Sequence, residues 1–175
     1  MSQSLVIEKA GPDDATLIVD VARKTFVETY SELGIRQNMG TYMEDYFTIE
    51  KITAELSRED LHFYIARYND TPIGFTKLRN DRLPKGITGK KCLEIERIYV
   101  LKEFQRHSGG KELMAVIKKM ARESQYQVIW LQIWQKNEKA VQFYRKSGFV
   151  VYETALFNFY DEVHNDFILR FDLYI

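Results

Sequence analysis

The chain has 175 residues, of which 25 are lysine or arginine and 25 are aspartate or glutamate, so its formal net charge is zero. This length suits one domain over residues 1–175, with a buried core. A neutral balance does not favour a general nucleic-acid binder, whose surface would carry a basic surplus. A single cysteine, Cys92, excludes a disulfide within the chain, and no apolar run is long enough to span a bilayer. Since no secretory signal is recognisable, a cytoplasmic location is expected.

The first half of the chain reads as short strands and amphipathic helices. Turn residues at 11–14 supply an N-cap for a helix, and Thr48 is a plausible cap for another. An Asn69-Asp70 turn between two apolar runs favours a hairpin. In chain order, the predicted elements are a strand at Leu5–Lys9, helices at 15–30, 42–47 and 50–56, strands at 62–68 and 72–78, and a polar loop at 80–91.

The second half begins with a strand, a glycine-containing loop and a helix whose apolar residues recur at helical spacing. The run VIWLQIW is typical of an interior strand. The predicted elements are a strand at 93–100, a polar loop at 102–110, a helix through Glu123, a strand at Val128–Trp134, a helix from Asn137 through Ser147 closed by Gly148, strands at 149–157 and 166–173, and a polar loop at 160–165. This order predicts an α/β (α+β) fold, with a mixed, mostly antiparallel sheet, helices on both faces and one parallel strand pair.

The loop before the helix has the physical properties of an anion site. The first amides of a helix lack intrahelical partners and carry the positive end of its dipole. Gly109 and Gly110 allow close approach to the backbone, and Arg106, His107 and Lys111 add positive charge. A tight turn stabilised by glycine is the alternative reading. Neither of the two common nucleotide-binding glycine motifs is present.

A second group of residues follows the interior strand. Asn137, Ala140, Phe143 and Tyr144 fall largely along one side of the predicted helix. Tyr144 could turn its hydroxyl toward whatever lies between the two parallel strands. An ordinary amphipathic helix with Asn137 as its N-cap explains the same spacing, so this pattern by itself leaves both readings open.

Together, QRHSGG (105–110) and NEKAVQFYRKSGF (137–149) resemble the two motifs of the GNAT superfamily of N-acetyltransferases, in the same order and at a similar separation. The resemblance covers essentially the whole chain and implies about seven strands with a splayed parallel pair. LEIERIYVLKEFQ, TFVETY and the FYDE stretch are similar to PaiA-type polyamine (spermidine/spermine) acetyltransferases. Ser108 replaces the first glycine of the motif; if that position needs a positive φ, serine costs up to roughly 1–2 kcal/mol.

The resemblance implies acetyl-CoA as the co-substrate and no metal. Splayed strands leave backbone groups without ladder partners, and the amides of a pantetheine arm can pair with them. The cofactor-binding residues it implies are Ile98, Tyr99 and Val100 on the strand, Gln105, Arg106, His107, Ser108, Gly109, Gly110 and Lys111 around the pyrophosphate, and Asn137, Ala140 and Tyr144 on the other wall.

The implied chemistry is direct attack of a primary amine on the acetyl thioester. The amine must first lose a proton, and Glu96 is the expected base or water-relay carboxylate. Glu96 could instead be an ion-pair partner of Arg97 or of a loop lysine. Tyr144 matches the family's general acid. The residues expected to contact the acceptor are Glu28, Tyr30, Glu94 and Tyr160.

A small-molecule amine, with a polyamine such as spermidine favoured, is the expected acceptor because carboxylates and aromatic faces suit a flexible polycation. A protein or peptide N-acetyltransferase and a non-enzymatic CoA-binding regulatory module are the alternatives. No nucleic-acid or membrane partner is expected. Homodimers are common in the family. The three histidines are scattered and form no metal-ligand pattern.

Overall fold

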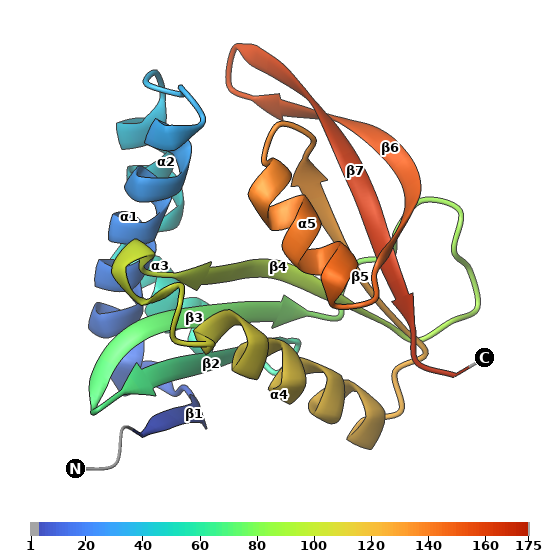
Figure 1. The fold of residues 1–175 in the computed structure, drawn as a ribbon, viewed down its shortest axis with the longest axis horizontal. Coiled ribbons are helices and arrows are strands. Elements are labelled where there is room, and N and C mark those ends of the chain that lie inside the picture. Colours follow the sequence, from blue (N-terminus) through green and yellow to red (C-terminus); the bar gives the residue numbers. More distant parts are fainter. Residues whose placement is uncertain (1–3, 175) are drawn as a thin grey trace. The chain divides into compact units, whose positions relative to one another are not determined.

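The computed structural model describes residues 4–174. Its seven-stranded sheet has the order β1-β2-β3-β4-β5-β7-β6, and β4 and β5 are parallel (Figure 1). The elements are β1 (Leu5–Lys9), α1 (Ala15–Glu32), α2 (Met39–Tyr46), α3 (Ile49–Leu56), β2 (Leu61–Tyr68), β3 (Thr71–Arg79), β4 (Cys92–Val100), α4 (Gly109–Glu123), β5 (Val128–Trp134), α5 (Glu138–Lys146), β6 (Val150–Phe159) and β7 (Glu162–Asp172), with short 3-10 turns before α1 and α4.

The mixed, mostly antiparallel fold is therefore confirmed, and most boundaries agree within a few residues. Thr48 caps α3 by accepting a hydrogen bond from the amide of Lys51. The polar loop predicted at 160–165 is wrong, because β7 already begins at Glu162. Tyr160 adopts a φ of 56°, which lets a tight turn join the strands and pair Phe159 with Glu162. Polar residues that alternate along a strand resemble a loop in the sequence.

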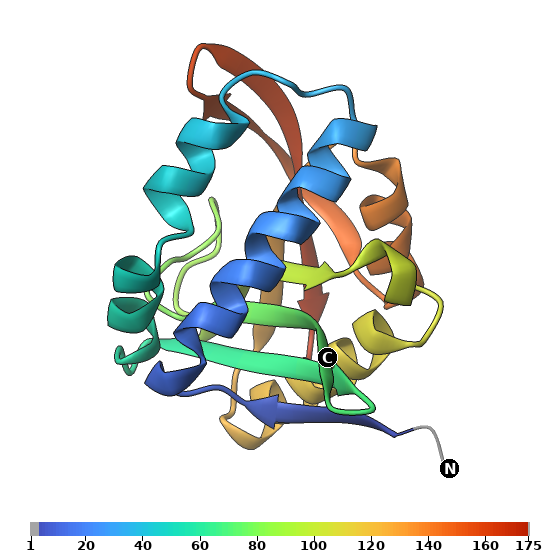
Figure 2. The same ribbon diagram turned by 90° about the vertical axis from the view of Figure 1, so that its left-hand side faces the viewer.

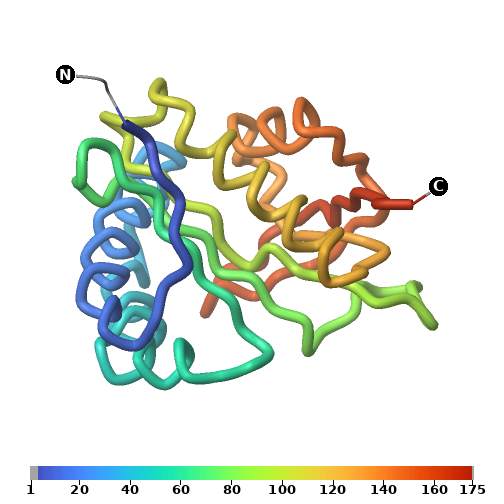
Figure 3. Tube along the Cα trace, turned by 90° about the horizontal axis from the view of Figure 1, so that it is seen from below, coloured from blue at the N-terminus to red at the C-terminus, as the bar shows by residue number. Residues whose placement is uncertain are grey.

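The described residues group into two compact units, and the first contains the chain up to Leu78 together with Arg97–Val116. In this unit α1 runs across the strands and lies beside α3 (Figures 2 and 3). Ile18, Ala22 and Phe26 on α1 are buried, as the helical spacing of its apolar residues predicted.

The C-terminal end of β4 is tightly packed within the first unit. Ile98 and Val100 pack against a core of Ala66, Ile73 and Leu113. A Cβ atom on Gly74 of β3 would lie 2.4 Å from the carbonyl oxygen of Tyr99. Only a residue without a side chain fits there, so this glycine allows β3 to lie against the end of β4.

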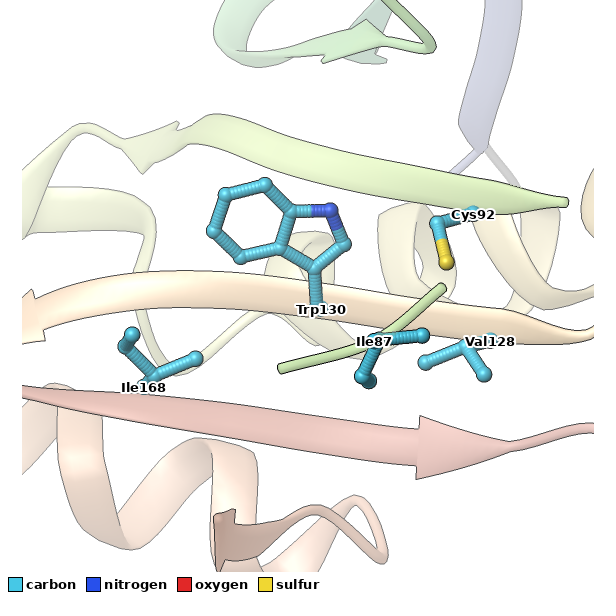
Figure 4. Close-up of a cluster of buried hydrophobic side chains, with 5 residues drawn as sticks. All are labelled: Ile87, Cys92, Val128, Trp130 and Ile168. Atoms are coloured by element: carbon cyan, nitrogen blue, oxygen red, sulfur yellow. The ribbon is translucent and has the colours of Figure 1, made fainter. Parts of the chain in front are cut away.

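The second unit contains Arg79–Glu96 and Ile117–Ile175, although Ile175 lies outside the described residues. The parallel ladder between β4 and β5 comprises three pairs and ends at Glu94↔Trp130, whereas β5 pairs with β7 over its whole length. A cluster around Trp130 covers one face of these strands, with Cys92, Val128 and Ile168 beside it and Ile87 from the 80–91 loop (Figure 4). The thiol of Cys92 is thus a buried packing group.

The helix α5 is held at both ends. The side chain of Asn137 accepts a hydrogen bond from the amide of Ala140, as an N-cap does. Gly148 follows the helix with a φ of 93°, which suits a C-terminal glycine, and its Cα faces the ring of Phe171 on β7. Within residues 4–174, no helix combines the length and the apolar character needed to cross a membrane.

Candidate active site

The loop between β4 and α4 has the geometry of an anion site. The amide of Glu112 donates to the carbonyl of Ser108 (2.9 Å) and closes the first turn of α4. The amides of Gly109, Gly110 and Lys111 precede that bond, so the helix offers them no acceptor. Three adjacent amides at the positive end of a 15-residue helix fit a pyrophosphate group.

Ser108 adopts a φ of 61°, so the position does require the left-handed conformation that glycine tolerates best. Gly109 has a different function. It is buried, and a Cβ there would lie 3.1 Å from the Cδ1 atom of Ile73. Gly109 therefore lets the start of α4 lie close to β3.

Polar and aromatic side chains shape the rest of this loop. The side-chain amide of Gln105 donates to the carbonyl of Val100 (3.3 Å), which ties the loop to the end of β4. The ring of His107 lies edge-on to that of Tyr68, with 4.8 Å between centroids, and 5.6 Å from that of Phe104. Arg106 and Lys111 are exposed and can meet an anion from solvent.

Two residues predicted to contact the acceptor lie in the first unit. The carboxylate of Glu28 accepts a hydrogen bond from the amide of Lys102 (2.9 Å), so it holds the segment that follows β4. The ring of Tyr30 lies 4.4 Å from that of Phe26. Burial raises the pKa of Tyr99 well above its usual value, and its ring packs edge-on to Phe75. An acceptor contact by Glu28 or Tyr30 stays a prediction.

Glu94 is a strongly perturbed carboxyl group of the second unit. It is 6% exposed, and its Oε2 atom has no hydrogen-bond partner in the described part of the chain. Burial raises its pKa to about 7, while the nearby Arg82 opposes that rise, at 3.9 Å from Oε1. A carboxyl group with this pKa exchanges a proton near neutral pH, as a general base must.

Glu96 has a different environment. Its carboxylate lies 3.2 Å from the guanidinium of Arg79, which also donates to both oxygens of Asp81 at 2.6 Å. Glu96 is therefore in an ion pair, as its alternative role predicted, but the partner is Arg79, which that prediction did not name. Because this ion pair engages the carboxylate of Glu96, Glu96 is the weaker candidate for a base on geometric grounds.

Tyr144 is 5% exposed and lies between aromatic rings on α5 and the segment after it. Its ring centroid is 5.3 Å from that of Phe143 and 5.7 Å from that of Phe149, both edge-on. Packing of this kind fixes the direction of the phenol. The Oδ1 atom of Asn137 is used by the cap, so a pantetheine contact would use its amide nitrogen.

Several polar residues of the second unit were missed by sequence reasoning. Arg79 lies between the predicted strand at 72–78 and the predicted loop at 80–91, Asp81 and Arg82 lie in that loop, and Asp166 begins the predicted strand at 166–173. The one available signal was Gln132, a polar residue inside an apolar run. Its side chain donates to Asp166 (3.0 Å). Tyr160, predicted to contact the acceptor, lies in the β6–β7 turn and is exposed.

Comparison with known proteins decides the family. Residues 21–149 match the acetyltransferase (GNAT) family. The chain belongs to this family. It is 28% identical over 164 residues to an uncharacterized N-acetyltransferase in the pepI 3′ region of Lactobacillus delbrueckii subsp. lactis, covering 94% of this chain and 95% of the relative. It is 26% identical over 155 residues to the spermidine N(1)-acetyltransferase of Thermoplasma acidophilum, covering 86% and 91%.

A solved structure extends the likeness to the fold. The crystal structure of the PaiA N-acetyltransferase from Thermoplasma acidophilum, in complex with coenzyme A, superposes with a TM-score of 0.80. It is 24% identical and covers 97% of this chain and 99% of that one. As a GNAT member the protein is an N-acetyltransferase that uses acetyl-CoA. Across residues 4–174, no group of three or more His, Cys, Asp or Glu side chains could hold a metal ion.

Proposed function

We propose that this GNAT acetyltransferase acetylates a primary amine of a polyamine, with spermidine as the first acceptor to test. One observation carries the proposal: Glu94, a buried carboxyl group whose Oε2 lacks a partner within the described residues and whose pKa burial raises to about 7. The relative from Thermoplasma acidophilum that is named a spermidine N(1)-acetyltransferase supports the choice of acceptor.

Acetyl-CoA supplies the activated acyl thioester. The helix amides at Gly109–Lys111 and the charges of Arg106 and Lys111 would hold its pyrophosphate. Ile98 and Val100 would contribute backbone groups only, because their side chains are committed to the core. Asn137 would donate to the pantetheine arm.

A carboxylate on β4 would take the proton from the acceptor ammonium, which is protonated at neutral pH because its pKa is near 10. The two candidates are Glu96, which the resemblance favours, and Glu94, which the electrostatics favour. Tyr144 would donate a proton to the departing thiolate. In this scheme the amine attacks directly and no acyl-enzyme forms.

The test is release of free CoA thiol from acetyl-CoA across a panel of polyamines, monoamines and peptide N-termini. We expect turnover with spermidine, and about a 100-fold lower kcat in Tyr144→Phe with little change in the KM for acetyl-CoA. Tyr174→Phe, which removes the hydroxyl of an exposed tyrosine that has no role in the proposed chemistry, is the matched control. Turnover confined to peptides would contradict a polyamine acceptor and indicate a protein acceptor. An unaltered kcat in Tyr144→Phe would contradict the role of Tyr144 as the general acid.

A further inference from the structure

A second buried carboxylate of the second unit, Asp166 on β7, is not used by the proposed chemistry. Asp166 is 5% exposed, and its Oδ1 atom has no hydrogen-bond partner among the described residues. Its other oxygen, Oδ2, accepts only a neutral hydrogen bond in the described part of the chain, from the side-chain amide of Gln132. Burial raises the pKa of Asp166, and His164 opposes that rise. A buried carboxylate oxygen without a partner calls for an explanation, such as a ligand, an ordered water or a function.

Aromatic rings lie beside Asp166. Trp134 is its partner in the register between β5 and β7. The indole stacks on the imidazole of His164 with 4.3 Å between centroids, and His164 also lies parallel to Phe159 at 5.6 Å. The ammonium of Lys136 lies 5.5 Å from the centroid of the Trp134 ring. This ring therefore already attracts one ammonium group, supplied by the chain itself.

Two polar neighbours of this cluster, Gln132 and Glu162, have exposed side chains. Gln132 is exposed although the carboxylate it contacts is buried. Glu162, whose carboxylate lies 3.1 Å from the Nε2 atom of His164, is 42% exposed at the side chain. An incoming ammonium could take the place of the Gln132 amide, because a charge-assisted hydrogen bond is stronger than the neutral one it would replace.

The strand register sets the spacing between Asp166 and Glu94. Glu94 is opposite Trp130, and Asp166 is opposite Trp134, on the two sides of β5. Four residues along a strand and two strand spacings across give roughly 16 Å between their Cα atoms. An extended spermidine separates its terminal nitrogens by about 11 Å, taking the reach of an extended chain. The carboxylate oxygens lie a few ångströms from their Cα atoms, so an extended spermidine with a hydrogen bond of about 2.8 Å at each end has a length of the same order as this separation.

From this geometry we infer that Asp166 is a specificity-determining residue that binds a second ammonium group of the acceptor, at the far end of a linear polyamine of about the length of spermidine. The inference rests on the proposed function, since it requires an amine acceptor. Asp166 would be the residue that distinguishes a polyamine from a monoamine.

The experiment compares two acceptors of equal length, octamethylenediamine and octylamine, which differ only in the distal amine. In the wild type we expect a higher kcat/KM for the diamine. Asp166→Asn should lower kcat/KM for the diamine roughly 10- to 100-fold, the range for a hydrogen bond to a charged group. The kcat/KM for octylamine should stay within about twofold. Glu153→Gln removes an exposed carboxylate of the same unit and is the matched control.

Activity with octylamine also reports whether the variant is folded, so a misfolded Asp166→Asn protein cannot imitate the expected result. Equal losses for both amines, or a wild type without preference for the diamine, would overturn the assignment of Asp166 and leave amine acetylation standing. Absence of turnover with every amine would overturn the proposed function itself.

Discussion

The two halves of β4 have opposite characters. In the first half, burial raises the pKa of Glu94 to about 7, whereas the partly buried Glu96 is paired with Arg79. In the second half, Ile98 and Val100 use their side chains for packing and leave only the backbone for a ligand. One strand can therefore offer a proton-accepting side chain at one end and only backbone N–H and C=O groups at the other. Burial changes the pKa of a titratable side chain but leaves a peptide group neutral.

The largest expected effect distinguishes the two candidate bases on β4, Glu94 and Glu96. If Glu94 is the base, Glu94→Gln should lower kcat/KM about 100-fold or more and abolish the rise of kcat/KM with pH around 7, since only the ionised carboxylate accepts a proton. Glu96→Gln, the matched variant two residues away, should then retain that rise. The pH profiles of both variants measure this, and the reverse result would assign the base to Glu96.

A side chain added at Gly74 of β3 should disturb the packing of the second half of β4. A methyl group on Gly74 would lie 2.4 Å from the carbonyl oxygen of Tyr99 and 3.1 Å from the Cα atom of Val100, both backbone atoms that cannot rotate away. Gly74→Ala should therefore lower the free energy of unfolding by about 2 kcal/mol or more. Urea denaturation measures this loss.

Gly40→Ala is the control for that variant. Gly40 lies in α2, and no atom would lie within 4 Å of an added Cβ. Alanine there should leave stability unchanged or raise it by up to about 1 kcal/mol through helix propensity. Equal losses in the two alanine variants would show that close packing at Tyr99 is not the cause.

The free energy of unfolding should depend on pH through Glu94, in the first half of β4. The pKa of Glu94 is 4.5 in an unperturbed chain and about 7 here, so the folded state holds its proton more tightly than the unfolded state does. This group's contribution therefore favours folding less as pH rises from about 4.5 to 7, by an amount on the order of 2–3 kcal/mol. Urea denaturation of the wild type and Glu94→Gln across this range measures it, and parallel curves would contradict a raised pKa.

The smallest expected effect concerns the loop that follows the second half of β4. Ser108 has a φ of 61°, so Ser108→Gly should relieve strain and raise the free energy of unfolding by about 1 kcal/mol or less. Ser108→Ala keeps the Cβ atom and should give no such gain. Thermal unfolding of both variants measures the difference. A gain in the alanine variant would point to the hydroxyl group instead of the backbone.

The β4–α4 loop around Ser108 and the helix α5 with its Asn137 cap could be predicted because their geometry is local. A positive φ at Ser108, the helix that begins beside it and the Asn137 cap all depend on residues a few positions away. The strands β1 and β5 were predicted at both ends for the same reason, since short apolar runs bounded by turns define them. The start of β7 was not, because its polar residues resemble a loop until pairing with β6 is known.

The sequence by itself determined the order of elements, the family motifs and the set of residues offered for chemistry, since these depend on spacing along the chain. Tertiary structure alone decided which carboxyl groups are perturbed. Glu94 and Glu96 look alike in the sequence, yet one is buried beside Trp130 and the other is paired with Arg79. Asp166 became a candidate only through its burial and its place opposite Trp134. Burial and pairing arise when distant segments pack together, and a carboxyl group's proton affinity follows from them.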